Sequence, residues 1–394
     1  MSKMFGAILV TGARQVGKTT LLKETTGNSR YVTLDDKILL VNAVEQSGTF
    51  FKDNPPPVFV DEVQYAPNLF SHIKIILDNE NKKGQFYLSG SQQFEMMRNV
   101  SESLAGRLGI LNLQGLSLRE IYGVAFNRPF LPTEEFFEFQ SKEKAEISYS
   151  EVWEIIHRGG FPELNANRDF DLNLFFAAYV MTYIERDVRS LAQVANEIKF
   201  TQFLAVAASR TGQLLNIASL ARDVGVSQPT VERWLSVLVS SNIVYLLKPF
   251  HNNITARTVK TPKLYFLDTG LAAYLTRWST PDVLKNGAMS GAFFESFVVS
   301  EIIKSYSNNG ILDIPLYFYR DRDGNEIDLL IEDNGILYPV EIKKHADPDK
   351  SDVLKFSVLN KIPGLKRGPG GVVCLYDKLI TLHENDRAIP VSML

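Results

Sequence analysis

The sequence has only one cysteine in 394 residues, Cys374, so no intramolecular disulfide can form. This scarcity of thiols is typical of a reducing compartment, and we expect a cytoplasmic protein. The sequence also lacks a signal peptide and any apolar run of transmembrane length, so no membrane partner is expected. Its five histidines are scattered without the spacing of metal ligands, and we expect each to be structural or at the surface.

Neither sign of charge dominates, since 42 Lys and Arg residues face 45 Asp and Glu residues. The net charge of −3 therefore gives no global signal for nucleic-acid binding, although a local basic patch stays open. A hydrophobic content of 45% and a charged content of 22% are typical of a globular protein. The length predicts two to three domains, each with its own core.

The most specific pattern is a short apolar strand, residues 8–11, followed by a glycine-containing loop and a helical segment. Gly12-x4-Gly17-Lys18-Thr19 has the spacing of a P-loop, whose backbone N–H groups surround phosphate at a helix N-terminus. Lys18 would reach the terminal phosphates, and the Thr19 hydroxyl would ligate Mg²⁺. A structural glycine-rich turn is the alternative, but the flanking strand and helix favour ATP binding. The predicted ATP-binding residues are Gly12, Ala13, Arg14, Gln15, Val16, Gly17, Lys18, Thr19 and Thr20.

Two later strands end in polar side chains that suit a nucleotide site. Residues 58–62 read as a buried strand ending in Asp61 and Glu62, a Walker B pattern. The first acid would hold Mg²⁺ through water, and the second would polarise the attacking water. Residues 86–91 form the next predicted strand, where Ser89 or Ser91 would sense the γ-phosphate, orient water, or simply cap the following helix.

Arg107 precedes another predicted strand, residues 110–113. An arginine here would stabilise transition-state charge, either in cis or from a neighbouring subunit of a homo-oligomer. Pairing of Arg107 with a carboxylate is the open alternative.

These segments resemble bacterial and archaeal AAA-type ATPases, which carry Gly-x-Arg-Gln-x-Gly-Lys-Thr-Thr, Asp-Glu-x-Gln, Ser-Gly-Ser and Leu-x-Gly-Arg. The corresponding residues here are 12–20, 61–64, 89–91 and 104–107. The resemblance implies a parallel αβα ATPase core over residues 1–123 that binds ATP and Mg²⁺. Because few residues precede the first strand, unlike in that family, the contact to the adenine base stays open. The catalytic candidates are Lys18, Glu62, Ser89 and Arg107, and the metal ligands Thr19 and Asp61.

The middle of the chain is predicted to be helical. We interpret residues 124–195 as a connector, poorly periodic over 126–150 and with a long helix over 175–191 that carries Arg186, Asp187 and Arg189. Residues 196–280 form a predicted winged-helix-like domain, because 217–235 has the turn glycine, capping serine and first-turn proline of a helix-turn-helix. DNA contact and plain packing both remain open for its second helix. That helix would expose Gln228, Thr230, Glu232 and Arg233.

Residues 326–343 have a strong hairpin pattern around Asn334-Gly335. If Asp333 faces Ile336, then Asp328 lies opposite Glu341. The other face then pairs residues 327, 329 and 331 with 342, 340 and 338, all apolar, and a one-residue slip would destroy it. The two carboxylates would lie about 5 Å apart between Cβ atoms. Such proximity is unfavourable unless a cation bridges them or one is protonated.

An Asp followed by Glu-x-Lys on the adjoining strand is similar to the PD-(D/E)xK nucleases, although Ile327 stands where that family name has proline. The resemblance implies a restriction-endonuclease-like α/β domain over residues 281–394, in which the acids hold Mg²⁺ and the lysine positions water. The helix over 291–306 would supply Glu295, with Glu301 as the alternative acid. A surface ladder in which Glu326 and Lys343 neutralise each other is the other interpretation. The predicted nuclease site is Glu295, Asp328, Glu341 and Lys343.

Together these patterns predict an α/β protein that binds and hydrolyses ATP with Mg²⁺ and acts on or regulates DNA. The alternative is an ATP-dependent conformational switch that signals to a protein partner through a catalytically inactive nuclease-like module. A small-molecule kinase is less favoured, because no acceptor-binding domain is evident.

Overall fold

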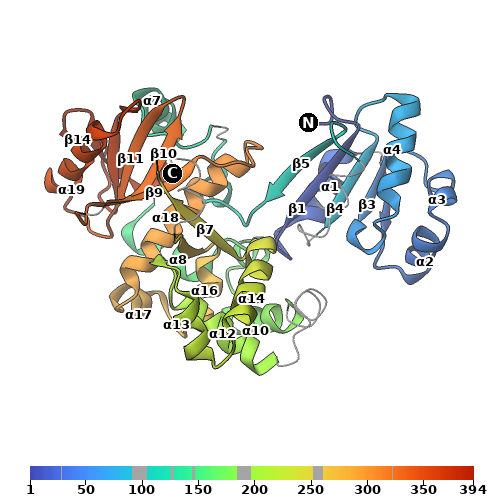
Figure 1. Cartoon of the computed structure of the whole chain (residues 1–394), viewed down its shortest axis with the longest axis horizontal. Helices are drawn as coiled ribbons and strands as arrows, with labels where there is room; N and C mark the ends of the chain where they lie inside the picture. Colours follow the sequence, from blue (N-terminus) through green and yellow to red (C-terminus); the bar gives the residue numbers. More distant parts are fainter. Residues whose placement is uncertain are drawn as a thin grey trace. The chain divides into compact units, whose positions relative to one another are not determined.

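The chain folds into two compact units (Figure 1). The computed structural model describes residues 1–27, 29–90, 104–125, 128–143, 147–183, 197–251, 261–321 and 323–394. The first unit comprises Met1–Gly115 and Ser240–Asn242, and the second comprises Leu116–Val239 and Ile243–Leu394. The predicted divisions after residues 195 and 280 both fall within the second unit.

The first unit is built on one parallel sheet, as expected for an αβα core. Its strand order is β2-β3-β4-β1-β5, so β4 lies between β1 and β3. The strands are β1 Ala7–Gly12, β2 Arg30–Thr33, β3 Val58–Asp61, β4 Phe86–Gly90 and β5 Leu108–Leu113. The main helices are α1 Lys18–Thr26, α2 Lys37–Glu45, α3 Ser47–Asp53 and α4 Leu69–Glu80.

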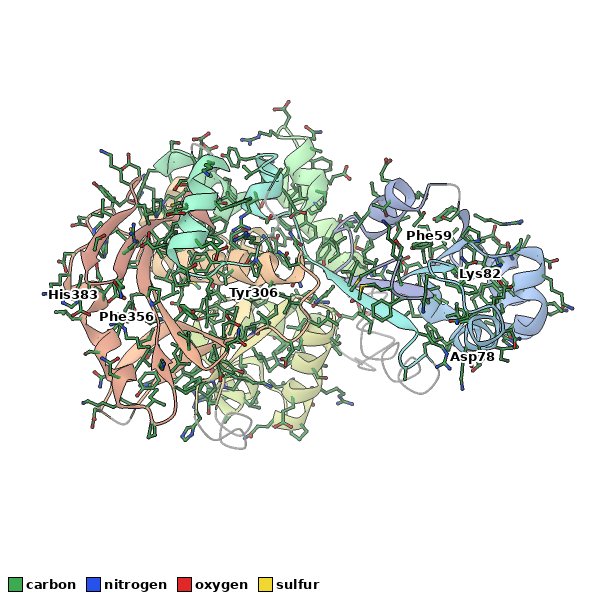
Figure 2. The ribbon with its side chains drawn as sticks, turned by 90° about the horizontal axis from the view of Figure 1, so that it is seen from above. Phe59, Asp78, Lys82, Tyr306, Phe356 and His383 are labelled. Carbon is green, nitrogen blue, oxygen red and sulfur yellow. The ribbon has the colours of Figure 1, made fainter. Side chains whose placement is uncertain are left out.

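Apolar residues of β1 pack on both faces of this sheet, which explains its unbroken hydrophobic run. Leu9 packs with Phe70 and Ile73 of α4 on one face. Ile8 and Val10 pack with Leu22 of α1 and with Phe59 on the other (Figure 2). Because all five strands run parallel, their carboxyl ends meet at one edge of the sheet, where ligands bind in open α/β folds.

The second unit has one large core shared by its helices and one face of its sheet. The bounds of its early helices are α6 Leu118–Ile121, α7 Glu134–Glu143, α8 Tyr149–Arg158, α9 Pro162–Ala166 and α10 Leu172–Tyr183. Residues 126–150, interpreted as part of a connector, contain helix α7 and the start of α8, and Phe136 and Phe137 of α7 are buried in this core. The end of the predicted helix 175–191, with Arg186, Asp187 and Arg189, lies outside the described residues.

Three helices and three short strands follow in the order α12-β6-α13-α14-β7-β8. Strand β8 pairs antiparallel with both β6 and β7. Gly225 ends α13 in the left-handed conformation (φ 73°), and the Thr230 amide lies 3.4 Å from the Ser227 hydroxyl at the start of α14. Two helices joined by a short turn therefore occupy the segment predicted as a helix-turn-helix. The bounds are α12 Glu197–Ala208, β6 Gln213–Leu214, α13 Ile217–Val224, α14 Gln228–Ser240, β7 Val244–Pro249 and β8 Lys263–Phe266.

The C-terminal strands continue the same sheet through a parallel β7–β9 pair, giving the order β14-β15-β13-β11-β10-β9-β7-β8-β6. Helix α18 carries Tyr306 in the large core, whereas Phe356 of η3 packs in a separate cluster with β10 and β11 (Figure 2). The bounds are α16 Thr269–Leu275, α17 Pro281–Asn286, α18 Ser290–Ser307, β9 Leu316–Arg320, β10 Glu326–Asp333, β11 Ile336–Ile342, α19 Ser351–Leu354, η3 Lys355–Lys361, β12 Lys366–Arg367, β13 Gly370–Cys374, β14 Ile380–His383, β15 Asp386–Pro390 and η4 Val391–Met393.

The predicted hairpin register is confirmed for the part of β10 nearest the turn, from Leu329 paired with Val340 to Asp333 paired with Ile336. Ile327 is the exception to the predicted apolar face. It packs in the cluster with Phe356 and not in the large core, because β10 is irregular between Ile327 and Leu330. No helix in the described part of the chain is both long and apolar enough to cross a membrane.

Candidate functional site

The loop after β1 requires glycine at both ends. Gly12 has φ 145°, and a Cβ atom there would lie 2.1 Å from the carbonyl oxygen of Leu113 on β5. Gly17 precedes α1 in a left-handed conformation (φ 93°). Any larger side chain would therefore disturb the loop. The free N–H groups at the start of α1 make this turn suited to an anion.

Lys18 points its ammonium into this loop. Its Nζ atom donates to the carbonyl oxygens of Gly12 at 3.1 Å and Ala13 at 2.7 Å, and the residue is only 8% exposed. The predicted phosphate-binding lysine thus lies inside the loop formed by the predicted ATP-binding residues.

Asp61, at the carboxyl end of β3, accepts hydrogen bonds from three hydroxyl groups. Thr19 and Tyr31 donate to Oδ2 at 3.0 and 3.1 Å, and Ser89 of β4 donates to Oδ1. The structure therefore brings three predicted site residues together, Thr19, Asp61 and Ser89. A carboxylate with hydroxyl ligands at a phosphate-binding loop fits Mg²⁺, which prefers oxygen ligands. Ser91 lies outside the described residues.

Sequence reasoning did not find Tyr31 as a residue of this site. Strand β2 lies beside β3, and the Tyr31 ring packs 5.2 Å from that of Phe59 between centroids. Burial and the neighbouring Asp61 raise the pKa of the Tyr31 hydroxyl, so it is a hydrogen-bond donor at neutral pH. No sequence pattern marks a tyrosine that reaches across one strand to the next.

Glu62 follows Asp61 with a left-handed backbone (φ 58°), a conformation that is rare outside glycine and recurs at functional sites. Gln64 donates a hydrogen bond to its carboxylate. Burial raises the pKa of Glu62, while the charges of Lys18 and Arg14 oppose that shift. A carboxylate tuned toward neutrality and held next to the P-loop is suited to accept a proton from water.

Arg107 is not brought to this site. It immediately precedes β5, whose carboxyl end at Leu113 pairs with Gly12, so Arg107 lies at the opposite edge of the sheet. Its guanidinium pairs with Asp78 of α4, and both side chains are more than a third exposed. This geometry gives no support to a role in cis and matches the predicted alternative, pairing with a carboxylate.

A second constellation, the acidic centre, lies in the C-terminal sheet and consists of Glu295, Glu326, Asp328 and Glu341. Glu341 is fully buried, and its Oε1 atom lies 2.7 Å from Lys343 Nζ and 2.6 Å from Lys355 Nζ. Its Oε2 atom has no hydrogen-bond partner among the described residues. Burial, with Asp328 adding to it, raises the pKa of Glu341 to about 7. Glu341 therefore does not belong to an exposed surface ladder, although lysines do pair with it.

The four predicted nuclease residues lie close together but are not arranged as a metal site. Asp328 Oδ2 accepts from the backbone N–H of Ile342 at 3.0 Å, and burial and Asp328 together raise the pKa of Glu295. Glu295 Oε1 accepts from Tyr265 at 2.5 Å and lies 3.3 Å from Lys263 Nζ. No group of three or more His, Cys, Asp or Glu side chains is placed to hold a metal ion in the part of the chain that the structure describes.

Two details of the sequence analysis change here. Glu301, the alternative acid, lies elsewhere: it accepts from the Leu118 amide at 2.7 Å and pairs with Lys304 at 2.8 Å. Glu326 pairs with Lys263 at 2.7 Å and not with Lys343, because the irregularity in β10 removes the simple cross-strand pairing. Lys263, Tyr265 and Lys355 gave no signal in the sequence, since tertiary packing alone brings them to the centre.

The helix-turn-helix presents a mixed surface. Gln228, Glu232 and Arg233 of α14 are exposed as predicted, and Thr230 is partly exposed. Arg222 of α13 is exposed as well. Two arginines on neighbouring helices supply positive charge, but Glu232 lies on the same surface.

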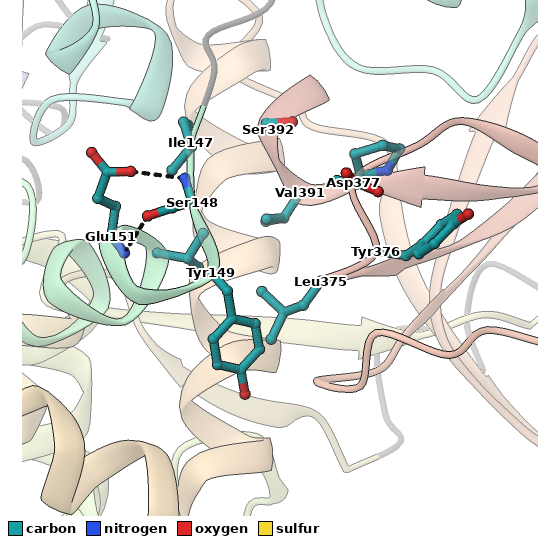
Figure 3. A pocket seen from close by; sticks show the side chains of 11 residues that line it. Ile147, Ser148, Tyr149, Glu151, Leu375, Tyr376, Asp377, Val391 and Ser392 are labelled. Atoms are coloured by element: carbon teal, nitrogen blue, oxygen red, sulfur yellow. Dashed lines mark hydrogen bonds between the residues drawn. The ribbon is translucent and has the colours of Figure 1, made fainter.

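Two cavities are lined by residues of the second unit alone. One, of about 630 Å³, lies between Tyr149 at the start of α8 and Tyr376 after β13 (Figure 3). The Glu151 carboxylate in its lining already accepts a hydrogen bond from the Ser148 backbone N–H, as part of a capping box. The other, of about 780 Å³, is lined by His251, Tyr319 and Arg320 beside the acidic centre.

Comparison with known proteins separates the chain into three matched regions. Residues 149–282 and 290–394 match families described as domains of unknown function, DUF8612 and DUF4143. An uncharacterized protein of Mycobacterium bovis and one of Mycobacterium tuberculosis are each 28% identical to this chain over 365 residues, covering 90% of the chain and 74% of the relative. Residues 5–122 match the family described as AAA domain. The parallel sheet, the P-loop and this match agree, and the first unit is an AAA-type P-loop domain.

Proposed function

We propose that this protein is a Mg²⁺-dependent ATPase. The observation that carries the proposal is the convergence of Thr19 and Ser89 on the buried Asp61, next to the loop that encloses the Lys18 ammonium. These side chains come from three elements, α1, β3 and β4, and meet at the Asp61 carboxylate. The AAA-domain match of residues 5–122 supports the same activity.

Each residue of this site has a separate role in the proposed hydrolysis. Backbone N–H groups of the loop bind the phosphates, and Lys18 exchanges the carbonyls of Gly12 and Ala13 for terminal phosphate oxygens. Thr19 and Asp61 would hold Mg²⁺, which neutralises charge that develops on the phosphates. Glu62 orients the attacking water and accepts its proton, while Gln64 fixes the glutamate carboxylate. Ser89 keeps Asp61 in place from the neighbouring strand.

ATP hydrolysis by the purified full-length protein tests this proposal. Lys18→Ala should reduce turnover at least about a hundredfold, since removal of one such transition-state contact costs about 2.7–4 kcal/mol. The matched control is Lys52→Ala, which removes an exposed lysine from α3 of the same unit. Turnover that survives in Lys18→Ala would reject the site assignment.

We further propose that the protein acts on DNA or is regulated by it. The order α12-β6-α13-α14-β7-β8, with β8 paired to β6 and β7, resembles a winged helix, and the exposed arginines 222 and 233 are its candidate phosphate contacts. DNA should stimulate ATP hydrolysis in the wild type but not in Lys18→Ala. For the Arg222→Ala, Arg233→Ala double variant we measure the slope of the logarithm of the DNA-binding constant against the logarithm of the salt concentration. This slope should be smaller than that of the wild type by the equivalent of about two phosphate contacts.

For the C-terminal region we propose a PD-(D/E)xK nuclease-like fold, because α18, β9, β10 and β11 occur in the order expected and juxtapose Asp328 with Glu341. As arranged, the acidic centre does not fit a metal, so we derive no cleavage step from it. Glu341→Ala separates the two candidate functions. Loss of phosphodiester cleavage with ATP turnover intact would favour a nuclease. No cleavage by the wild type and ATP turnover indifferent to DNA would favour the switch that signals to a protein partner.

A further inference from the structure

Lys263 contributes a buried positive charge to the acidic centre from outside the elements that carry the acids. It is the first residue of β8, whereas the acids are on α18, β10 and β11. Its side chain is only 6% exposed, and its Nζ atom lies 2.7 Å from Glu326 and 3.3 Å from Glu295. Tyr265, two residues later on β8, donates to the same Glu295 oxygen at 2.5 Å. Strand β8 thus holds Glu295 by two side chains.

Cations of the chain itself pair with three of the four acids of the centre. Within the described residues, Lys263 pairs with Glu295 and Glu326. Lys343 and Lys355 share Glu341, and Arg320 lies 3.9 Å from Glu326. Burying a charge is unfavourable unless it is paired, so removal of one of these cations would leave an acid buried without its partner.

We propose that Lys263 is a built-in counter-cation that keeps the acidic centre closed to divalent metal ions. The proposal rests on the proposed nuclease-like character of this centre. A metal ion bound by Glu295 and Asp328 would lie within a few ångströms of the Lys263 ammonium. At an effective dielectric constant near 20, repulsion at such distances lowers affinity by more than an order of magnitude.

Mn²⁺ binding tests the proposal directly, without reference to any activity. Full-length protein is titrated with Mn²⁺ in the absence of nucleotide, and free Mn²⁺ is measured by electron paramagnetic resonance. All proteins carry Asp61→Asn, which removes the candidate metal ligand of the P-loop. Lys263→Met removes the charge and keeps most of the side-chain length. Lys248→Met, on the exposed side of the neighbouring strand β7, is the matched control, and Lys263→Arg keeps the charge.

We expect Lys263→Met to bind one Mn²⁺ at least about tenfold more tightly than the unsubstituted centre. Lys263→Arg and Lys248→Met should bind like the unsubstituted centre, and adding Asp328→Asn to Lys263→Met should abolish the gain. Bound Mn²⁺ should also raise the melting temperature of Lys263→Met, because a ligand of the folded state alone stabilises it.

Two other outcomes would overturn the proposal in different ways. Equal, Asp328-dependent binding with and without Lys263 would show a metal site that the lysine does not close. Absence of binding in every variant would reject the metal site and, with it, the role of Lys263. If Lys263→Met does not fold, Lys263→Gln replaces it, since this change removes the charge and keeps a side chain that can donate to Glu295 and Glu326. It should tighten Mn²⁺ binding a fewfold, and unchanged binding would contradict the proposal.

Discussion

At the scale of single residues, Asp61 owes its position to hydroxyl groups from three different elements. Thr19 comes from α1, Tyr31 from β2 and Ser89 from β4. If Thr19 ligates a metal ion as proposed, Tyr31 and Ser89 would remain to hold the carboxylate. The Tyr31 hydroxyl should therefore matter most for metal affinity and little for nucleotide binding itself.

Tyr31→Phe tests this role. Loss of one hydrogen bond to a charged group costs about 1.5–3 kcal/mol when buried, and less here because Tyr31 is partly exposed. We expect the Mg²⁺ concentration for half-maximal ATP hydrolysis to rise about three- to tenfold, with ATP affinity unchanged. Titration of turnover with Mg²⁺ measures it. Tyr87→Phe, which removes a hydroxyl from β4 of the same sheet, is the control and should leave the titration unchanged.

For Arg107 we predict that substitution has little effect. Its ion pair with Asp78 is exposed, and such pairs contribute about 0–1 kcal/mol. Arg107→Ala should therefore change the free energy of unfolding of the first unit by less than about 1 kcal/mol and leave turnover of the dilute protein within about twofold. Asp78→Ala should behave in the same way. A large loss of turnover in Arg107→Ala alone, growing with protein concentration, would instead indicate a contribution from a neighbouring subunit.

Residues whose role follows from their position at the end of a strand or the start of a helix were predictable from the sequence. Residues that reach a site only through tertiary packing were not. Lys18, Thr19, Asp61 and Ser89 follow directly from the ends of predicted parallel strands and the start of α1. Tyr31 and Lys263 act across strand boundaries, where no local pattern applies.

At the scale of elements, α18 serves two separate purposes. Its first half carries Glu295 into the acidic centre, and its second half carries the buried pair Glu301 and Lys304. That pair holds the backbone where the second unit begins, through the Leu118 amide at 2.7 Å and the Leu116 carbonyl at 2.9 Å.

Breaking this pair should be costly. Glu301→Gln or Lys304→Met alone leaves a buried charge without its partner, which costs about 3–5 kcal/mol. The double substitution removes both charges, so its cost should be clearly smaller than the sum of the two single costs. Urea unfolding of the second unit measures all three. Glu138→Gln, on the exposed side of α7, is the control, and additive costs would mean that the two charges do not act as a pair.

The elements themselves were predicted unevenly. The hairpin register followed from strand alternation and from Asn334-Gly335, because a two-residue turn fixes both strands. Helix α8 was missed, yet the sequence carries its start signal, since Ser148 and Glu151 have the spacing of a capping box. The irregularity in β10 has no such signal, and it moved Ile327 and Glu326 from their predicted partners.

At the scale of the whole molecule, each unit has its own hydrophobic cores. Among the described residues, the clusters of the first unit contain no side chain of the second, and the reverse holds as well. The parallel sheet of the first unit followed from the P-loop pattern. The continuous sheet of the second did not, because it depends on the pairing of Lys248 with Tyr317, which lie far apart in the sequence.

Separate cores predict separate unfolding. We expect two thermal transitions in full-length protein, and a non-hydrolysable ATP analogue with Mg²⁺ should raise only that of the first unit. At a ligand concentration of about 100 times Kd the shift corresponds to about 2.7 kcal/mol.

Cys374 reports on the second unit: it is fully buried on β13, and burial raises the pKa of its thiol to about 11. Only about one thiol in a thousand is then ionised at pH 8, so the folded protein should resist thiol reagents.

Calorimetry and Cys374 labelling together show whether the two units unfold separately. Calorimetry follows both transitions, and labelling of Cys374 at pH 8 follows the second unit alone. Nucleotide should move the first transition and leave the labelling rate unchanged, and in Lys18→Ala it should move neither. If instead nucleotide slows Cys374 labelling, or a single transition moves as a whole, the units unfold together. Occupancy of the P-loop would then stabilise the unit that contains the acidic centre, which requires energetic coupling between the two units despite their separate cores.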